Sequence, residues 1–311
     1  MLSICIPIFN YDTSNLLNDL QVQINRVKIP VEIVCIDDCS SSPFVEKNQE
    51  ICRKSGTYIQ LNCNVGRARI RNLFLEHTKY EYLLFLDCDS VIAFPNFIEQ
   101  YLNAITEGTT VICGGRIYSK ERPKRQNLLR WQFGRKRESL HADVRSKQSN
   151  KSFMTNNFLI NRNTLTHIKF EERLEQYGHE DTLFGFHLKM NNICISHIDN
   201  PVLNGHLEHN AEFISKTEHG LENLISILGY VNQNGVYIND VALLNFYQQC
   251  RNKRLIPLIT ILFSASQSLL KAFLSTGFAG LWLFDFYKLG FFTSLVAKTK
   301  REQLKLLNVK H

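Results

Sequence analysis

The sequence predicts an α/β fold, a doubly wound and mostly parallel sheet followed by a C-terminal helical appendage. Short apolar runs alternate with segments of helical spacing between residue 2 and about residue 89. Polar groups directly follow three of these runs, at Asn10, Asp37 and Asp87. Beyond about residue 250 the alternation stops, and apolar and aromatic residues dominate. These observations together favour βαβ units first and helices afterwards.

The elements follow from local signals along the chain. Ser14 is a suitable N-cap for the first helix, and Asn64 to Gly66 forms the turn that opens the third. The expected strands are residues 2–9, 31–36, 58–61, 82–86, 112–117 and 153–160. The expected helices of this part are residues 14–27, 44–54, 67–77, 180–189 and 213–232.

Composition places the chain among globular proteins with a reduced interior. It has 311 residues, of which 44% are apolar, enough for one large domain with an appendage. Nine cysteines without any C-x-x-C pair favour free thiols in a cytosolic protein. The N-terminus lacks a basic segment and a cleavage site, so we expect a first strand and no signal peptide.

The positive charge is concentrated in one segment. The chain carries a net charge of +7, and between residues 116 and 151 the sequence has 12 Lys or Arg against 3 Asp or Glu. Such a segment can be a solvated loop, a site for phosphates or anionic lipid, or a nucleic-acid patch. No nucleic-acid motif accompanies it, so we expect no nucleic-acid partner.

Asp87 and Asp89 are the first candidates for chemistry. They end the apolar run at residues 82–86 and, being two residues apart, they face the same way. In doubly wound sheets, ligands bind beyond the carboxyl ends of the strands, where Asn10 and Asp37 also fall. Two hard oxygen ligands suit Mg²⁺ or Mn²⁺ that also binds a diphosphate. Each polar group taken alone could equally be a turn.

The C-terminal region predicts two apolar helices. Residues 255–274 carry a polar stripe on one face, and residues 281–296 are rich in aromatic side chains. The stripe consists of Thr260, Ser264, Gln267 or Ser268, and Lys271, and a basic tail follows with Lys298, Lys300, Arg301, Lys305 and Lys310. We expect neither segment to reach a clean 18-residue membrane span. The alternatives are helices lying in a membrane interface, or a hairpin packed on the domain or in a dimer. We expect a catalytic domain at residues 1–232 and a helical region at 233–311.

Five motifs occur in order between residue 2 and about residue 230. They are Pro7-x-Phe9-Asn10, Asp37-Asp38-Cys39-Ser40, Asn64-x-Gly66 leading to Arg71-Asn72, Asp87-x-Asp89, and Gly178-x-Glu180-Asp181. Their order and spacing resemble those of the family 2 glycosyltransferases, which have the GT-A fold. The resemblance implies that a nucleotide sugar is the donor and that Mn²⁺ or Mg²⁺ is the cofactor.

The resemblance also implies a role for individual residues. Pro7 and Phe9 would border the nucleotide, and Asp38 would accept a hydrogen bond from its base. Arg67 and Arg71 would approach the nucleotide or brace the carboxylates. Asp87 would contact the ribose or a water on the metal, Asp89 would ligate the metal, and His206 would be a third ligand. Asp181 would be the general base, with Glu180 binding the acceptor beside it.

Two departures from the family pattern are visible. Cys39 stands where the family has Gly, and Ile70 where it has Ala, and we expect both to tighten local packing. Gln126-x-x-x-Arg130-Trp131 is similar to the Q-x-x-R-W of processive synthases, but it has one residue too many and precedes the Glu180-Asp181 motif. We therefore predict a non-processive enzyme.

The resulting expectation is an inverting transferase that adds one sugar, taken from a UDP-sugar, to a glycan or lipid-linked glycan in surface polysaccharide biosynthesis. It would be cytoplasmic and peripheral on the inner face of the cell membrane. The alternatives are a sugar-phosphate nucleotidyltransferase and a non-catalytic scaffold that binds nucleotide sugars. A nucleotidyltransferase would carry a Gly-rich loop after the first strand, where residues 10–13 contain no Gly. The sequence does not specify the donor sugar, the linkage or the oligomeric state.

Overall fold

A computed structural model describes the backbone of residues 1–174, 177–232 and 234–308, with side chains described up to residue 299 apart from residue 234. The chain forms two compact units. Unit 1 consists of Met1–Glu121, Gly134–Glu175 and Glu180–His206, and unit 2 of Arg122–Phe133, Gln176–His179 and Leu207–His311.

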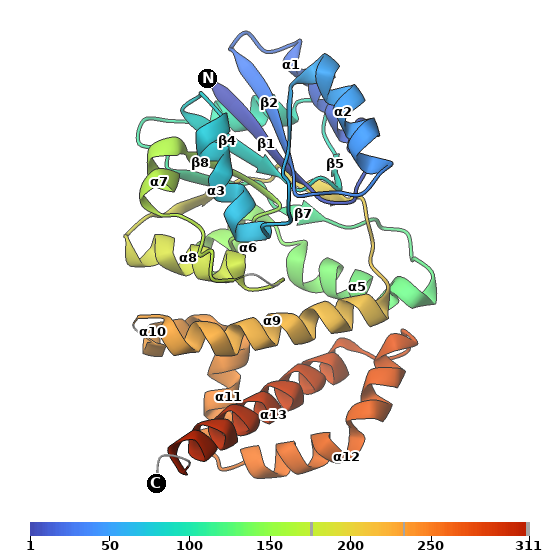
Figure 1. Cartoon of the computed structure of the whole chain (residues 1–311), viewed down its shortest axis with the longest axis vertical. Coiled ribbons are helices and arrows are strands. Elements are labelled where there is room, and N and C mark those ends of the chain that lie inside the picture. The colour runs from blue at the N-terminus through green and yellow to red at the C-terminus, as the bar shows by residue number, and fades with distance from the viewer. Residues whose placement is uncertain (175–176, 233, 309–311) are drawn as a thin grey trace. The chain divides into compact units, whose positions relative to one another are not determined.

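Unit 1 is built on a seven-stranded sheet whose central strands lie side by side in Figure 1. Its order is β3 (Thr57–Gln60), β2 (Val31–Asp37), β1 (Leu2–Ile8), β4 (Tyr82–Leu86), β8 (Asn157–Asn161), β6 (Val111–Cys113) and β9 (Ile195–His197). β1 is parallel to both β2 and β4, and only β8 runs antiparallel to its neighbours. The predicted α/β class with a mostly parallel sheet is confirmed.

Helices cover both faces of this sheet. One face packs against α1 (Ser14–Ile24), α2 (Phe44–Ser55) and α4 (Phe97–Ala104), through Leu17, Cys52 and Tyr101 among others. The other face packs against α3 (Arg67–His77), α7 (Arg162–His167) and α8 (Glu180–Met190), through Phe74 and Phe184 among others. Because β-strands alternate their side chains, sheet residues such as Ile4 and Cys5 enter opposite cores.

The expected strand at residues 112–117 is two strands in two sheets. β6 ends at Cys113, and β7 (Arg116–Ile117) pairs with β10 (Val202–Asn204), which also pairs with β5 (Ser90–Ile92). Gly114 and Gly115 make the transition: a Cβ at Gly114 would lie 2.4 Å from the Tyr101 hydroxyl, and Gly115 has φ +91°. Glycine is needed there, and it moves Arg116 into the small sheet. Unit 1 also contains η2 (Gly134–Glu138) and α6 (Ala142–Ser146).

Unit 2 is helical. It contains η1 (Arg125–Asn127), α5 (Leu128–Phe133), α9 (Asn210–Tyr230), α10 (Asn234–Asp240), α11 (Ala242–Asn252), α12 (Ile256–Ser275) and α13 (Leu281–Asn308). Its core joins Ile214 of α9 to Phe263, Leu274 and Phe284. The compact units therefore divide after His206, because α9 shares its core with the C-terminal helices. The functional boundary near residue 232 stays a prediction.

The expectation about membrane-span length was wrong for α12. This helix has 20 residues and is long and apolar enough to cross a membrane by length and composition. The apolar residues of this helix outweigh the few polar side chains of its stripe. Two hydroxyls of the stripe are satisfied within the helix: Thr260 donates to Ile256 O (2.9 Å) and Ser264 to Thr260 O (2.8 Å). Of the predicted basic tail, Lys298 is exposed, while the side chains of Lys300, Arg301, Lys305 and Lys310 lie outside the described residues.

Candidate active site

The ends of β1 and β2 are tied together by side chains. Asn10 has φ +48°, and its Oδ1 accepts hydrogen bonds from Ser41 N–H (2.8 Å) and from the Ser41 hydroxyl (3.0 Å). Cys39, at the position where the family has Gly, has φ +66°. The substitution therefore retains the backbone conformation that a glycine would adopt, and its consequence is local strain rather than tighter packing.

Asp38 is a structural anchor as well as a predicted base contact. Its two carboxylate oxygens accept hydrogen bonds from Val65 N–H (2.6 Å) and Gly66 N–H (3.1 Å) at the start of α3. Burial raises the pKa of this carboxyl, and the two backbone hydrogen bonds oppose that effect. Nearby, Pro7 pairs with Ile36 within the sheet, and the Phe9 side chain is exposed. Their predicted contacts with the nucleotide stay predictions.

Asp87 is held between two arginines. Its Oδ1 lies 3.2 Å from Nη2 of Arg71, and its Oδ2 lies 3.7 Å from Nη2 of Arg116. Arg71 is buried in α3, where it also donates to Arg67 O (2.9 Å). Burial by itself would raise the pKa of Asp87, but Arg71, Arg67 and Arg116 outweigh it, so that pKa is lowered. Asp87 is therefore a fixed, ionised acceptor.

Asp89 has the opposite environment. Its carboxylate makes no hydrogen bond or ion pair with the part of the chain that the structure describes, and burial together with Asp87 raises its pKa. Gly205 N–H donates to Asp89 O (2.9 Å), which brings His206 to the same side of the site. The His206 ring lies edge-on to Tyr11, with ring centroids 6.4 Å apart.

These groups fit a divalent cation that shares its coordination with a ligand. Asp89 offers a carboxylate with vacant lone pairs, and His206 offers an imidazole beside it, while Asp87 is occupied by its arginines. The described residues contain no ready group of three His, Cys, Asp or Glu side chains around one point. A cation here would need oxygens from a bound diphosphate and water to complete its shell.

Glu180 and Asp181 open α8 on the same side. Glu180 is buried, and its Oε1 lies 3.5 Å from Nη1 of Arg67. Burial and the neighbouring Glu180 raise the pKa of Asp181 to about 6, although Thr182 N–H donates to its Oδ1 (2.6 Å). Arg71 connects the two carboxylate groups: burial lowers its pKa, and the charges of Asp87, Glu180 and Asp181 oppose this. Arginines of α3 thus contact Asp87 after β4 and Glu180 of α8, and their charges also act on Asp89 and Asp181.

Arg116 is a site residue that the motif analysis missed. It contacts Asp87, and its Nη1 also lies 3.9 Å from Oε2 of Glu138, which accepts a hydrogen bond from the Tyr118 hydroxyl. Its Nε is buried without a hydrogen-bond partner among the described residues. Arg116 is one of twelve Lys or Arg residues in the basic segment, so its charge alone did not distinguish it. The local signal of a special position was the Gly114-Gly115 pair that precedes it.

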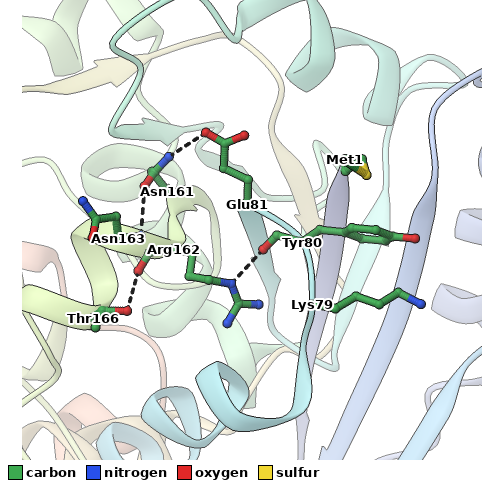
Figure 2. A pocket seen from close by; sticks show the side chains of 8 residues that line it. All are labelled: Met1, Lys79, Tyr80, Glu81, Asn161, Arg162, Asn163 and Thr166. Atoms are coloured by element: carbon green, nitrogen blue, oxygen red, sulfur yellow. Dashed lines mark hydrogen bonds between the residues drawn. The ribbon is translucent and has the colours of Figure 1, made fainter.

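A pocket elsewhere in unit 1 is not a competing site. It is lined by residues such as Lys79, Tyr80 and Arg162 at the amino-terminal ends of β1 and β4 (Figure 2). Arg162 uses its nitrogens to bind Tyr80 O, Leu75 O and the Thr78 hydroxyl, at 2.6–2.9 Å. These contacts stabilise the fold and leave the pocket without the paired carboxylates of the other end.

A doubly wound sheet with Asp-x-Asp at its carboxyl edge and a Glu-Asp pair opposite is the arrangement expected from the resemblance to GT-A glycosyltransferases. The family profile of glycosyl transferase family 2 matches residues 3–169, more than half of the chain. The chain therefore belongs to glycosyl transferase family 2, which confirms the predicted family and enzyme class. A search of curated protein sequences found no significant match.

Solved structures share the fold. The mannosyltransferase PcManGT from Pyrobaculum calidifontis, in complex with GDP-Man and Mn²⁺, matches with a TM-score of 0.55 and 12% identity over 94% of this chain and 86% of that one. S. aureus TarS 1-349 with UDP-GlcNAc matches with a TM-score of 0.51 and 18% identity over 93% and 90%. TarS 1-349 without that ligand gives 0.50 and 21% over 78% and 69%.

Proposed function

We propose that this chain transfers one sugar from a nucleotide-diphosphate sugar, with UDP as the expected nucleotide, to a hydroxyl of a glycan or lipid-linked glycan, with inversion. The observation that carries the proposal is the contrast among three carboxyl groups around Arg71. Asp87 is held ionised by two arginines, Asp89 has no partner among the described residues, and the pKa of Asp181 is raised to about 6. These three different environments fit donor fixation, cation binding and proton transfer, respectively.

On the donor side, Asp89 with His206 beside it would hold Mn²⁺ or Mg²⁺. The cation supplies Lewis-acid stabilisation of the charge that develops on the diphosphate. Asp87, fixed by Arg71 and Arg116, presents a carboxylate that can accept hydrogen bonds from the ribose. Asp38, Pro7 and Phe9 would border the base, and Arg67, an exposed cation whose charge acts on Asp87 and Asp89, would approach the diphosphate.

On the acceptor side, Asp181 accepts the proton. The acceptor oxygen attacks the anomeric carbon, the bond from that carbon to the phosphate oxygen breaks, and the nucleoside diphosphate leaves with the electron pair. The acceptor's proton passes to a carboxylate oxygen of Asp181, which contributes roughly 10²–10⁴-fold to the rate. Glu180, oriented by Arg67, binds the acceptor beside it. A single displacement of this kind inverts the anomeric configuration.

Ligands of the similar structures support the donor class. PcManGT was captured with GDP-Man and Mn²⁺, and TarS with UDP-GlcNAc. By analogy we extend nucleotide-sugar use and divalent-metal dependence to this chain.

Non-processive transfer is supported by the surroundings of Arg130. The Arg130 side chain, which belongs to the motif similar to that of processive synthases, is engaged within unit 2. Its Nε lies 3.1 Å from Oε2 of Glu208, and its guanidinium lies 4.9 Å from the Phe213 ring centroid.

For the biological setting, we propose surface polysaccharide biosynthesis at the cytoplasmic side, with the enzyme peripheral on the inner face of the cell membrane. The family match favours a glycosyltransferase over a sugar-phosphate nucleotidyltransferase. A scaffold without catalysis would bind the donor and leave it intact.

A hydrolysis screen tests the proposal without knowledge of the acceptor. Purified protein is incubated with UDP-, GDP- and dTDP-sugars, each with Mn²⁺, Mg²⁺ or EDTA, and the released nucleotide is measured. We expect slow, divalent-dependent release from one class of donor, UDP-sugars first. Donor binding without release in any combination would favour the scaffold, and release that EDTA leaves unchanged would contradict the assigned cation site.

A further inference from the structure

Helix α12 presents an apolar outer face. This face consists of Leu258, Ile261, Leu262, Leu269 and Phe273, all of them exposed, with Leu269 75% accessible. At 100° per residue they cover an arc of about 120° on one side of the helix. Only 11% of the helix's apolar window is buried, which is far less than expected for a core helix of a soluble protein. A contiguous apolar patch of this kind marks an interaction surface.

Part of the polar stripe of α12 packs on the side opposite the apolar face, although Ser264 and Ser268 are exposed. Nζ of Lys271 lies 2.7 Å from Oε2 of Glu218 on α9, and the same glutamate accepts a hydrogen bond from the Tyr287 hydroxyl on α13. Phe263 and Leu274 are fully buried on this inner side. Lys271 of the stripe therefore helps to pack unit 2, and the apolar face is left exposed.

The outer face is continued by aromatic residues at the turn after α12. Phe278 and Trp282 are 63% and 74% exposed. Gly277, with φ +79°, brings this turn onto the backbone of Arg125: a Cβ at Gly277 would lie 2.2 Å from Arg125 O. The Arg125 guanidinium lies 4.6 Å from the centroid of the Phe278 ring. An exposed Trp and a Phe beside an arginine are typical of the depth of lipid headgroups.

Charge decides which occupant fits this surface. Exposed Arg251, Lys253 and Arg254 precede α12 at one end, and exposed Lys124 and Arg125 belong to the other end. No Asp or Glu occurs between Asp240 and Asp285. Two copies of the chain pairing through α12 would bring basic ends together in either a parallel or an antiparallel arrangement. An anionic lipid surface offers apolar depth and opposite charge at once.

We propose that the outer face of α12, together with Phe278 and Trp282, docks on an anionic lipid bilayer with the helix axis in the plane of the interface. The packed inner face keeps the helix from entering the hydrocarbon on all sides, so it lies on the membrane and does not span it. This inference rests on the proposed function in one respect, because it assigns the acceptor to the lipid-linked class.

Vesicle binding of the full-length protein tests the proposal. Vesicles of phosphatidylcholine with and without phosphatidylglycerol are sedimented with the protein at low and high salt. The test variant is Leu262→Gln/Leu269→Gln, and the matched control is Val22→Gln, which changes an exposed apolar residue of α1. We expect anionic vesicles to bind the wild type and the control, and binding of the test variant to fall at least tenfold. High salt should weaken the binding that remains.

Trp282 provides a direct reporter. The chain has two tryptophans, so Trp131→Phe leaves Trp282 alone, and we expect its emission to shift to the blue on anionic vesicles. Thermal unfolding and donor hydrolysis are measured for every variant. Hydrolysis should stay unchanged, so that a failure of the lipid proposal is distinguishable from a failure of the transferase proposal.

Three outcomes would overturn the proposal. The first is equal vesicle binding by wild type and Leu262→Gln/Leu269→Gln, with no change in Trp282 emission. The second is a dimer in light scattering that this variant dissociates, without any vesicle binding by the wild type, which would make a second copy the occupant. The third is wild-type protein that resists extraction from vesicles by alkaline carbonate, which would indicate a spanning helix.

Discussion

Asp87 and Asp89 differ in the charge that surrounds them, although they are neighbours on one strand end. Arg71 and Arg116 neutralise Asp87 and lower its pKa, whereas burial and the charge of Asp87 raise the pKa of Asp89. A carboxyl group whose ionised form is disfavoured gains most from a cation, because the cation restores the charge balance. At the residue scale, this contrast fits the proposed roles, in which Asp87 fixes the ligand and Asp89 binds the metal.

Replacing Asp89 should remove metal-dependent donor binding. In Asp89→Ala the diphosphate loses the anchor of its counter-ion, while the Asp87 ion pairs remain. Calorimetry with UDP in the presence and absence of Mn²⁺ measures the effect. Asp19→Ala, an exposed aspartate of α1, controls for the loss of one negative charge. Unchanged, Mn²⁺-dependent affinity in Asp89→Ala would remove this residue from the metal site.

Replacing Asp181 should affect transfer and spare the donor. The amide of Asp181→Asn cannot accept the acceptor's proton, so we expect a loss of roughly 10²-fold or more in turnover with donor affinity retained. In the wild type the base works only when deprotonated. Because its pKa is about 6, activity should rise with pH between about 5 and 7 and then level off. A parallel loss of folding and donor affinity would indicate that Asp181 only stabilises the start of α8.

Cys39 should be strained in its present conformation. A φ of +66° costs a residue with a Cβ about 1–2 kcal/mol, and more if the side chain is β-branched. We expect Cys39→Gly to be neutral or slightly stabilising, and Cys39→Val to lower the free energy of unfolding by more than about 1 kcal/mol. Denaturant unfolding compares these with Cys63→Val, an exposed loop cysteine without positive φ. Equal effects of the two valine variants would contradict the strain.

Motifs in the sequence predict which carboxylates belong to the candidate site, and their roles stay predictions; the sequence does not indicate what holds these side chains in place. Asp87, Asp89 and Asp181 were found from motifs, since carboxylates in that order and spacing seldom arise from turn chemistry alone. Arg116 could not be found, because its contact with Asp87 arises from a change of sheet at Gly114 and Gly115. Likewise, nothing local in the sequence indicated that both Asp38 oxygens bind the backbone of the third helix.

At the scale of elements, β7 and η2 form a second support for the site. Arg116 of β7 contacts Glu138 of η2, and the Tyr118 hydroxyl donates to the same carboxylate. A Cβ at Gly134 would lie 2.4 Å from the Tyr118 ring, so only glycine lets η2 approach this closely. The first turn of η2 is thereby packed against the strand that carries Arg116.

Removing Arg116 should shift the pH dependence of metal binding. In Arg116→Gln, Asp87 and Asp89 lose a nearby positive charge, so the pKa of Asp89 should rise further. We expect the pH midpoint of Mn²⁺-dependent UDP binding to move up by about one unit. Lys120→Gln, an exposed change in the same segment, should leave the midpoint where it is in the wild type. If both variants behave alike, Arg116 has no electrostatic role in the site.

Elements with strong periodicity were the predictable ones. The helix at Arg67–His77 and the strand at Tyr82–Leu86 have the predicted bounds, because a turn or polar pair limits each of them. The strand expected at 153–160 begins only at Asn157, and the short helix Phe97–Ala104 was not anticipated. Both are fixed by tertiary contacts: Asn157 binds Gly115 O and Asn200 O, far away in the sequence.

At the scale of the whole molecule, the two proposed surfaces belong to different parts of the chain. The nucleotide site uses residues of unit 1 alone, and the lipid-binding surface uses residues of unit 2 alone. Amide hydrogen exchange can therefore separate them. We expect UDP with Mn²⁺ to slow exchange in residues 36–42, 62–72 and 84–92, and anionic vesicles to slow exchange in residues 256–282. A ligand that binds only the native state raises the free energy of the opening reaction, and exchange through opening slows accordingly. The increase is about 2.7 kcal/mol when the ligand concentration is a hundred times Kd.

Asp89→Ala and Leu262→Gln/Leu269→Gln provide the controls, since each should erase one pattern of protection and leave the other. Asp89→Ala should lose the protection by UDP and keep that by vesicles, because its change lies beside β4. Leu262→Gln/Leu269→Gln should do the reverse, because its change lies on α12. If UDP protects residues 256–282 in the absence of vesicles, unit 2 takes part in donor binding and the assignment of separate surfaces is wrong. If vesicles protect only the basic residues before α12, lipid charge attracts the protein but the apolar outer face stays out of the bilayer.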